Sequence, residues 1–128
     1  MTASPPRAAL DMLCFLPARD FELSQRFYLE LGFERAWADG KLARFQIDGC
    51  AFMLQDFYVK AHAHNCMMHL RVACLDDWWR HVTALDLGRR YGCHSEPPAQ
   101  RPWGMRDFTL GDPSGVLWRI AENNNPAS

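Results

Sequence analysis

Two polar side chains that could bind a ligand or take part in catalysis lie in apolar, strand-like runs of this sequence. They are His69 and Arg119. His69 lies in the apolar run Cys66–Val72. There an imidazole either hydrogen-bonds a ligand, acts as a general base near neutral pH, or is satisfied by a neighbouring strand. Arg119 lies in a later apolar run, and a buried guanidinium needs a partner. That partner is a ligand carboxylate or phosphate, an acid such as Asp107 or Glu122, or a group from a dimer partner.

The other groupings of reactive side chains are weaker signals. His62 and His64 stand close together in a polar connector, where a solvated loop is a simpler explanation than a metal site. The chain has five cysteines, an odd number, and four of them fall in apolar runs, which indicates buried reduced thiols and not a disulfide framework. These four are Cys14, Cys50, Cys66 and Cys74. The sequence contains no glycine-rich nucleotide loop and no G-x-S-x-G nucleophile elbow.

Composition and charge narrow the class of protein. The chain has 128 residues, 48% hydrophobic and 23% charged, which suits one domain over residues 1–128 with a single core. Its net charge is −1 and its basic residues are scattered, which argues against a nucleic-acid partner. No apolar stretch approaches the roughly 20 residues of a membrane helix, and no signal sequence is evident. We therefore expect a cytoplasmic protein without a membrane partner.

The elements that must position these side chains begin with a βαβββ unit over residues 8–56. The apolar run Leu10–Leu16 predicts a strand that is covered on both faces. Asp20 is placed to cap a helix over Phe21–Leu31, and Gly32 is placed to end it. Three short strands should follow, separated by two Asp-Gly turns. They are predicted near Phe33–Trp37, Leu42–Ile47 and Cys50–Gln55.

The same order of elements recurs over residues 65–122. An apolar strand at Cys66–Val72 precedes a helix that carries Asp76 and Asp77 in its first turn, where the helix dipole favours acids. Three further strands complete the unit. They are predicted near Tyr91–Ser95, Met105–Leu110 and Val116–Ala121.

A residue-by-residue match supports this repeat. Asp20 corresponds to Cys74 near the start of the two units, and Gly49 corresponds to Gly115 before their last strands. The second pair is separated by a longer stretch of chain than the first, which implies an insertion in the second unit. We place that insertion in the Pro-rich stretch Glu96–Pro102, predicted to be a loop. Because neither unit can bury its sheet face alone, the two copies are expected to pack together.

Three segments of the sequence resemble a known family. They are LPARDFELSQRFYLELGFERAW, PWGMRDF and GDPSGVLWRI, and the resemblance extends over residues 10–122. It is to the glyoxalase, bleomycin-resistance and extradiol-dioxygenase (vicinal-oxygen-chelate) superfamily, and within it to the bleomycin-resistance-like branch. The resemblance implies an α+β fold in which two tandem βαβββ modules form a curved mixed sheet around a cleft. Members usually dimerise, and some exchange modules between chains, so a homodimer is expected.

The resemblance also locates the positions where metal-using members hold a divalent ion in that cleft. Carried over through the family's V-x-D and DP-x-G elements, these positions are Leu13, Met53, Met67 and Arg119. An aliphatic group, two thioethers and a guanidinium cannot hold a hard divalent cation. A strand register shifted along by one alternation would instead select Phe15, Gln55, His69 and Ala121, of which only Gln55 and His69 are donors. Neither a metal nor another cofactor is therefore expected.

The resemblance and the missing donors together favour binding over catalysis. We expect a non-catalytic protein that sequesters a small aromatic or antibiotic-like molecule in a dimer cleft, as bleomycin resistance proteins do. Bleomycin itself is cationic, and a net charge of −1 offers it little attraction. The expected ligand-binding residues are Phe15, Trp37, Phe45, Met53, Gln55, Met67, His69, Trp103 and Arg119, with Leu13 beside them. For Phe45, ordinary core packing is the favoured alternative.

Two other functions stay open at this point. One is a lyase, isomerase or dioxygenase of the superfamily, metal-free or with a shifted site that uses His69 and Gln55. The other is a dimer whose cleft is filled by its own side chains.

Overall fold

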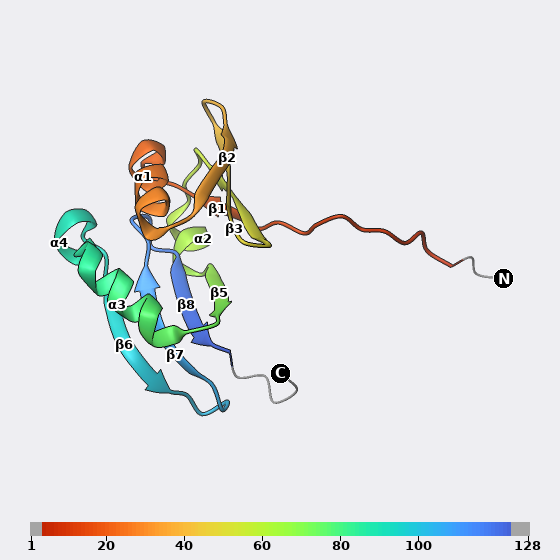
Figure 1. Ribbon diagram of the computed structural model, residues 1–128. Coiled ribbons are helices and arrows are strands. Elements are labelled where there is room, and N and C mark those ends of the chain that lie inside the picture. The colour runs from red at the N-terminus through yellow and green to blue at the C-terminus, as the bar shows by residue number, and fades with distance from the viewer. Residues whose placement is uncertain (1–3, 124–128) are drawn as a thin grey trace.

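The computed structural model describes residues 4–123 and contains two βαβββ modules (Figure 1). Module 1 consists of β1 (Phe15–Pro17), α1 (Phe21–Leu31), β2 (Glu34–Ala38), β3 (Leu42–Ile47) and β4 (Cys50–Gln55). Its strands form a four-stranded sheet in the order β1-β4-β3-β2, with β1 and β4 parallel and the other pairs antiparallel. The short helix α2 (Lys60–His64) leads to the second module.

Module 2 repeats this plan with one additional helix. It consists of β5 (Met67–Val72), α3 (Leu75–Leu85), α4 (Leu87–Tyr91), β6 (Ser95–Gln100), β7 (Arg106–Gly111) and β8 (Leu117–Glu122). Its sheet has the equivalent order β5-β8-β7-β6, again with one parallel pair, β5 and β8. The prediction of an α+β fold built from two tandem βαβββ modules is confirmed, and each module contributes its own mixed sheet.

Local signals account for the first helix. The side chain of Asp20 accepts a hydrogen bond from the backbone N–H of Leu23 at 3.1 Å, which satisfies one of the free donors of the first turn. The helix ends at Gly32, whose φ of 124° is a left-handed conformation that residues with a side chain rarely adopt. The residues that α1 buries include Phe27, Tyr28 and Leu31.

The two modules are joined through a buried polar contact among aromatic rings. The Tyr28 hydroxyl of α1 donates to Oδ2 of Asp112 at 2.6 Å and accepts from the indole Nε1 of Trp118 at 2.9 Å. Oδ1 of Asp112 accepts from the backbone N–H groups of Ser114 and Val116, both at 2.9 Å. Each polar atom of this junction therefore has a partner, although it lies inside the core.

Burial also sets the ionisation of this junction. It raises the pKa of Tyr28 well above the ordinary value, and the neighbouring Asp112 carboxylate adds to that rise, so the phenol keeps its proton and acts as the donor. Burial raises the pKa of Asp112 as well, while the hydrogen bonds from Tyr28 and from the turn's backbone oppose that rise. The contact is therefore a neutral phenol bonded to a carboxyl group.

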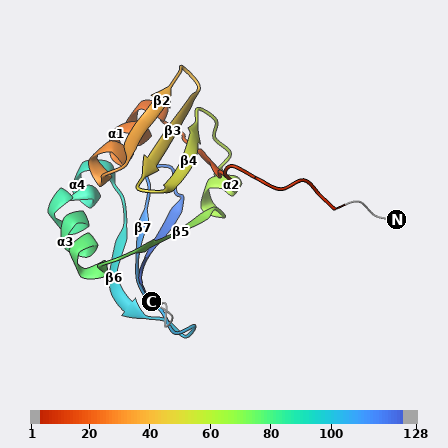
Figure 2. The same ribbon diagram turned by 45° about the vertical axis from the view of Figure 1, so that its right-hand side comes forward.

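The helices α1, α3 and α4 gather on one side of the molecule, as Figures 1 and 2 both show. The nitrogen Nε2 of His81 on α3 lies 2.7 Å from the carbonyl oxygen of Leu31, which connects the end of α1 to α3. On the sheets below, Phe52 packs edge-on against Tyr28, and Phe108 packs edge-on against Trp79 of α3. Each sheet thus has one face covered by its module's helix and one open face, a term used below for the face turned away from that helix.

The first predicted strand is much shorter than expected. The apolar run Leu10–Leu16 predicted a strand covered on both faces, but β1 begins only at Phe15. Upstream of it the chain leaves the body as an extended arm (Figures 1 and 2), with Leu10 94% and Met12 96% exposed. A run of apolar residues implies burial, and within the described part of this chain nothing covers these two side chains.

The Pro-rich stretch was also predicted wrongly. Residues 95–100 form strand β6 and not a loop, with a bulge between Glu96 and Ala99 where Pro97 and Pro98 lie. Proline lacks an N–H, so it is tolerated at a bulge of an edge strand, which β6 is. The predicted strand over Tyr91–Ser95 is instead the end of α4 and the segment that follows it.

The insertion in module 2 therefore lies largely before β6. Helix α3 begins at Leu75 and α1 at Phe21, so the helix starts are separated by the same length of chain as the matched residues Cys74 and Asp20. Strand β6 begins at Ser95 and β2 at Glu34, a wider separation, because α4 stands between α3 and β6.

The cysteines are more exposed than the sequence indicated. All five are free thiols, but Cys14, Cys50 and Cys74 are exposed and Cys66 and Cys93 are only partly buried. The expectation of buried thiols is wrong for the first three, which lie at the ends of strands and at a helix cap, where the chain enters or leaves the sheets. Among the described residues, no helix is both long and apolar enough to cross a membrane.

We predict that Tyr28→Phe lowers the free energy of unfolding by about 1–3 kcal/mol, because it leaves Asp112 and the indole N–H of Trp118 buried without their partner. Urea denaturation measures the change. Tyr58→Phe is the control, since Tyr58 is only partly buried, and it should cost less than about 0.5 kcal/mol. Equal effects of the two substitutions would contradict the role given to the Tyr28 hydroxyl.

Candidate functional site

The open face of module 1 carries one row of side chains across all four strands. Phe15 of β1 pairs with Met53 of β4, Met53 pairs with Arg44 of β3, and Arg44 pairs with Trp37 of β2. Paired residues project from the same face of a sheet, so these four side chains are neighbours. Phe15 and Trp37 are half-exposed, whereas Met53 is buried in this row, and Arg44 forms an ion pair with Asp11 of the arm at 3.6 Å.

The open face of module 2 carries the equivalent row. His69 of β5 pairs with Arg119 of β8, Arg119 pairs with Thr109 of β7, and Thr109 pairs with Glu96 of β6. Met67 lies two residues before His69 on β5, so it projects from the same face. It pairs with Leu117 and is more than half exposed. Strand alternation thus brings His69, Met67 and Arg119 to one face, as their spacing predicted.

A fully buried carboxylate, Asp107, lies on the same face and holds two arginines. Nε of Arg101 donates to Oδ1 of Asp107 at 2.7 Å, and Nη1 of Arg119 lies 3.2 and 3.3 Å from its two carboxylate oxygens. The protein acid that the sequence offered as one partner for Arg119 is therefore Asp107. Because a second guanidinium shares it, the cluster keeps a net positive charge.

Trp103 belongs to this cluster although it lies in a turn. The segment between β6 and β7 folds so that the Cζ atom of Arg119 lies 5.3 Å from the centre of the Trp103 ring, a cation–π distance. The indole is nevertheless 60% exposed. The open face of module 2 therefore presents an aromatic ring and two guanidiniums side by side.

One of the predicted residues occupies a different place from the rest. Phe45 is fully buried on the helix-covered face, where its ring stacks on Phe52 and packs against Tyr28, so it is a core residue and not part of an open face. Strand alternation explains this correction, because the neighbouring Arg44 takes the open face. Gln55 lies two residues after Met53 at the end of β4, so it belongs to the open face of module 1, where it is partly exposed beside Pro17 and Leu42.

The positions at which metal-using relatives place their ligands do not form a donor set here. Leu13 precedes β1, so the residue level with Met53 is Phe15, and the residue level with Arg119 is His69. The four positions Phe15, Met53, His69 and Arg119 offer one imidazole, beside a guanidinium that repels a cation. Within residues 4–123 no three His, Cys, Asp or Glu side chains gather in a way suited to a metal ion. The side chains present do not fit the family's divalent ion.

A groove lies between the two modules. It has a volume of about 480 Å³ and lies between the start of β4 and the middle of β5, with Met12 of the arm at its side. His69 and Arg71 line it from module 2, and Ala51 lines it from module 1. Residues of both modules, among them two from the open face of module 2, therefore line one groove.

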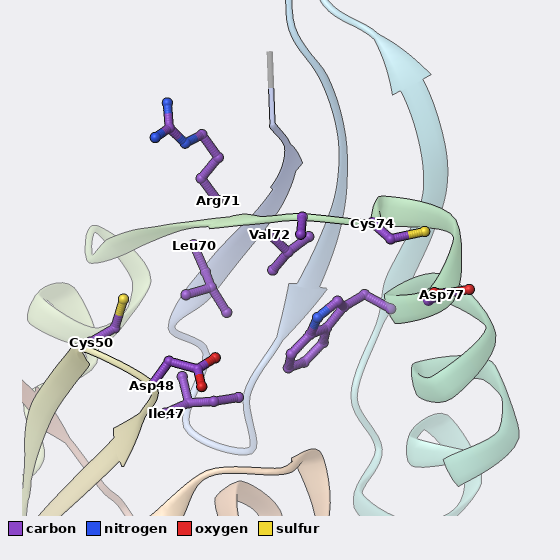
Figure 3. A pocket seen from close by; sticks show the side chains of 10 residues that line it. Ile47, Asp48, Cys50, Leu70, Arg71, Val72, Cys74 and Asp77 are labelled. Atoms are coloured by element: carbon purple, nitrogen blue, oxygen red, sulfur yellow. The ribbon is translucent and has the colours of Figure 1, made fainter. Parts of the chain in front are cut away.

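A second pocket, of about 380 Å³, lies on the opposite side of β5. Figure 3 shows Ile47 and Asp48 of module 1 facing Leu70 and Val72 of β5, while Arg71 points away to the other side of the strand. Its lining includes Leu70 and Val72 of β5 and Asp77 and Trp78 of α3, and it contains none of the residues that the sequence selected for the site. It is a gap between the modules and not part of the open faces.

Sequence reasoning missed Arg101 and Arg44. Arg101 was hidden because residues 96–102 were predicted to be a loop. Once β6 is known to pair with β7, the hairpin places Arg101 beside Asp107. Arg44 could have been found from alternation alone, since it stands between the buried Ala43 and Phe45.

Solved structures share this fold. The bleomycin resistance determinant encoded on transposon Tn5 superposes with a TM-score of 0.78 at 22% identity, covering 91% of this chain and 100% of that chain. Bleomycin-binding protein from Streptomyces verticillus, complexed with copper(II)-bleomycin, gives 0.79 at 20% identity over 93% and 100%. Lactoylglutathione lyase from Agrobacterium tumefaciens gives 0.68 at 20% identity over 93% and 96%. No sequence among curated proteins matches significantly.

The fold and the two open faces define a protein of tandem βαβββ architecture. The model of the Glyoxalase/Bleomycin resistance protein/Dioxygenase superfamily matches residues 10–120, and the chain belongs to that superfamily. The resemblance seen in the sequence is thereby confirmed.

We predict that Arg101→Met and Arg119→Met together destabilise the protein by more than the sum of the two single substitutions, by at least about 1 kcal/mol. Each single variant leaves Asp107 one guanidinium, whereas the double variant leaves a buried carboxylate unpaired, which costs about 3–5 kcal/mol. Urea denaturation of the four proteins of this cycle measures the coupling. Additive effects would mean that the two arginines do not share Asp107.

Proposed function

We propose that this chain is a metal-free binding protein that sequesters a small aromatic or antibiotic-like molecule in a cleft completed by a second copy of the chain. The observation that carries the proposal is the set of large apolar side chains left exposed on the open faces. Phe15 and Trp37 in module 1, and Met67 and Trp103 in module 2, are each about half exposed or more. Several large apolar side chains left exposed on one surface indicate a place for a ligand or a partner.

The character of these faces suits a planar organic ligand. Aromatic rings offer flat surfaces for stacking, and a few polar groups beside them can fix the ligand's orientation. Trp37 and Trp103 supply the rings, and His69 and Arg119 supply the polar groups. Solved relatives include bleomycin-binding protein complexed with bleomycin, which agrees with a small-molecule ligand.

Support for a second copy comes from the arm before β1. Leu10 and Met12 are almost fully exposed, and each would gain about 1.5–3 kcal/mol by burial. The arm leaves the body in an extended conformation, so it can reach a neighbouring copy (Figure 1). A homodimer would cover this arm and provide a second wall for the open faces.

The alternative is an enzyme of the superfamily with a non-standard site. Its candidate residues are Gln55 of module 1 and His69 of module 2, and these two donors are too few to hold a catalytic metal ion. The fold similarity to lactoylglutathione lyase carries no residue of a catalytic site to this chain. Binding is therefore the function that we favour, and the five free thiols agree with a reducing cytoplasmic location.

Titration with planar aromatic compounds, followed by tryptophan fluorescence, tests the proposal. We expect saturable quenching by at least one class of compound, because Trp37 and Trp103 lie on the binding faces. Met67→Glu should weaken this binding at least about tenfold, since it places a charge on the exposed apolar face.

The matched control is Leu29→Glu, which puts the same charge on an exposed apolar position of α1, outside both open faces. It should leave the affinity within about twofold. No saturable quenching by any compound, or equal loss in both variants, would contradict the proposed function.

A further inference from the structure

We propose that the ligand is an aromatic anion, whose acidic group is bound by Arg119 and Arg101 while its ring lies against Trp103. This inference rests on the proposed function and names the class of molecule that the same site accepts. It separates this chain from a receptor for cationic drugs, because the cluster of Arg101, Arg119 and Asp107 on the open face of module 2 has a net positive charge.

The first argument is the balance of charge. Asp107 is fully buried and accepts hydrogen bonds from two guanidiniums, Arg101 at 2.7 Å and Arg119 at 3.2 Å. A guanidinium is always protonated, so the cluster has two positive charges and one negative charge. A cluster with this surplus on a partly desolvated face attracts an anion and repels a cation.

The second argument is the number of donors left over. Arg119 uses Nη1 on Asp107, and Arg101 uses Nε and Nη2 on that residue's carboxylate and backbone carbonyl. Among residues 4–123, the structure gives no hydrogen bond from Nε or Nη2 of Arg119 or from Nη1 of Arg101. Both side chains are about one-fifth exposed, so these donors can reach a ligand. A carboxylate or phosphate fits them geometrically.

The third argument is the space beside the cluster. A pocket of about 400 Å³ lies along β6, and its lining consists of Arg101, Thr109, Glu96, Pro97, Pro98 and Ala99. The carboxylate of Glu96 lies 2.6 Å from Nε2 of His94, so its nearest side-chain partner is outside the Asp107 cluster. Thr109 pairs in register with Arg119, and its hydroxyl adds another polar group on the same face.

The ring of the ligand has a place next to its acidic group. Trp103 is 60% exposed and already lies against the guanidinium of Arg119. A flat aromatic ligand can stack on the exposed indole while its acidic group meets the guanidinium beside it. One molecule can therefore satisfy the aromatic and the cationic parts of this face at once.

Three compounds that share a naphthalene ring test the inference: 2-naphthoate, 2-naphthamide and 2-naphthylmethylammonium. Equilibrium dialysis against the full-length protein measures their affinities directly. We expect naphthoate to bind at least about tenfold more tightly than the amide, and the ammonium compound to bind most weakly. Arg119→Met should weaken naphthoate binding at least about tenfold and amide binding less than about threefold.

The control for charge is Arg80→Met, an exposed arginine of α3 that is paired with Asp77, and it should leave all three affinities unchanged. Arg119→Met is expected to fold, because Asp107 keeps Arg101 as its partner. Equal or tighter binding of the amide or the ammonium compound would overturn the anion inference and leave the proposed binding function standing. If none of the three compounds binds, while other planar compounds do, the anion inference again fails alone. If no planar compound binds, both fail.

Discussion

The structure depends on the buried contact of Tyr28 with Asp112 and Trp118. This contact joins the helix of module 1 to the sheet and turn of module 2, and every polar atom in it is satisfied. Aromatic packing surrounds it, since Phe33, Phe45 and Phe52 all lie against Tyr28. A core that is built between the helix-covered faces leaves the other face of each sheet free. The candidate functional site lies on these uncovered sheet faces.

The open faces keep the strand pairing of the fold while their side chains do not suit a hard divalent cation. Strand pairing preserves equivalent rows in the two modules, with Phe15 and Met53 in one and His69 and Arg119 in the other. The side chains of these two pairs are an aromatic ring, a thioether, an imidazole and a guanidinium. Such groups contact an organic molecule and do not hold a hard cation. The two arginines paired with Asp107 add a net positive charge to the open face of module 2.

Elements fixed by neighbouring residues could be predicted from the sequence, whereas elements fixed by contacts distant in the chain could not. Helix α1 and strands β3 and β4 were predicted with the bounds observed, because Asp20, Gly32 and the Asp-Gly turns act within a short stretch of chain. Strand β6 was missed because two prolines indicated a loop, whereas pairing with β7 tolerates them at a bulge. The arm was predicted to be buried because an apolar run does not reveal whether the covering surface belongs to the same chain. At the site, alternation correctly placed His69 and Arg119, but only the hairpin pairing reveals Arg101.

The central claim is that this chain keeps the superfamily's fold and has replaced its metal site by a surface that binds an organic ligand. Metal content is its most direct test. Protein purified without chelators and analysed by inductively coupled plasma mass spectrometry is predicted to hold far less than one equivalent of any transition metal per chain. Stoichiometric, tightly bound iron, manganese, nickel or zinc that survives dialysis would contradict the account and favour a superfamily enzyme with a shifted site.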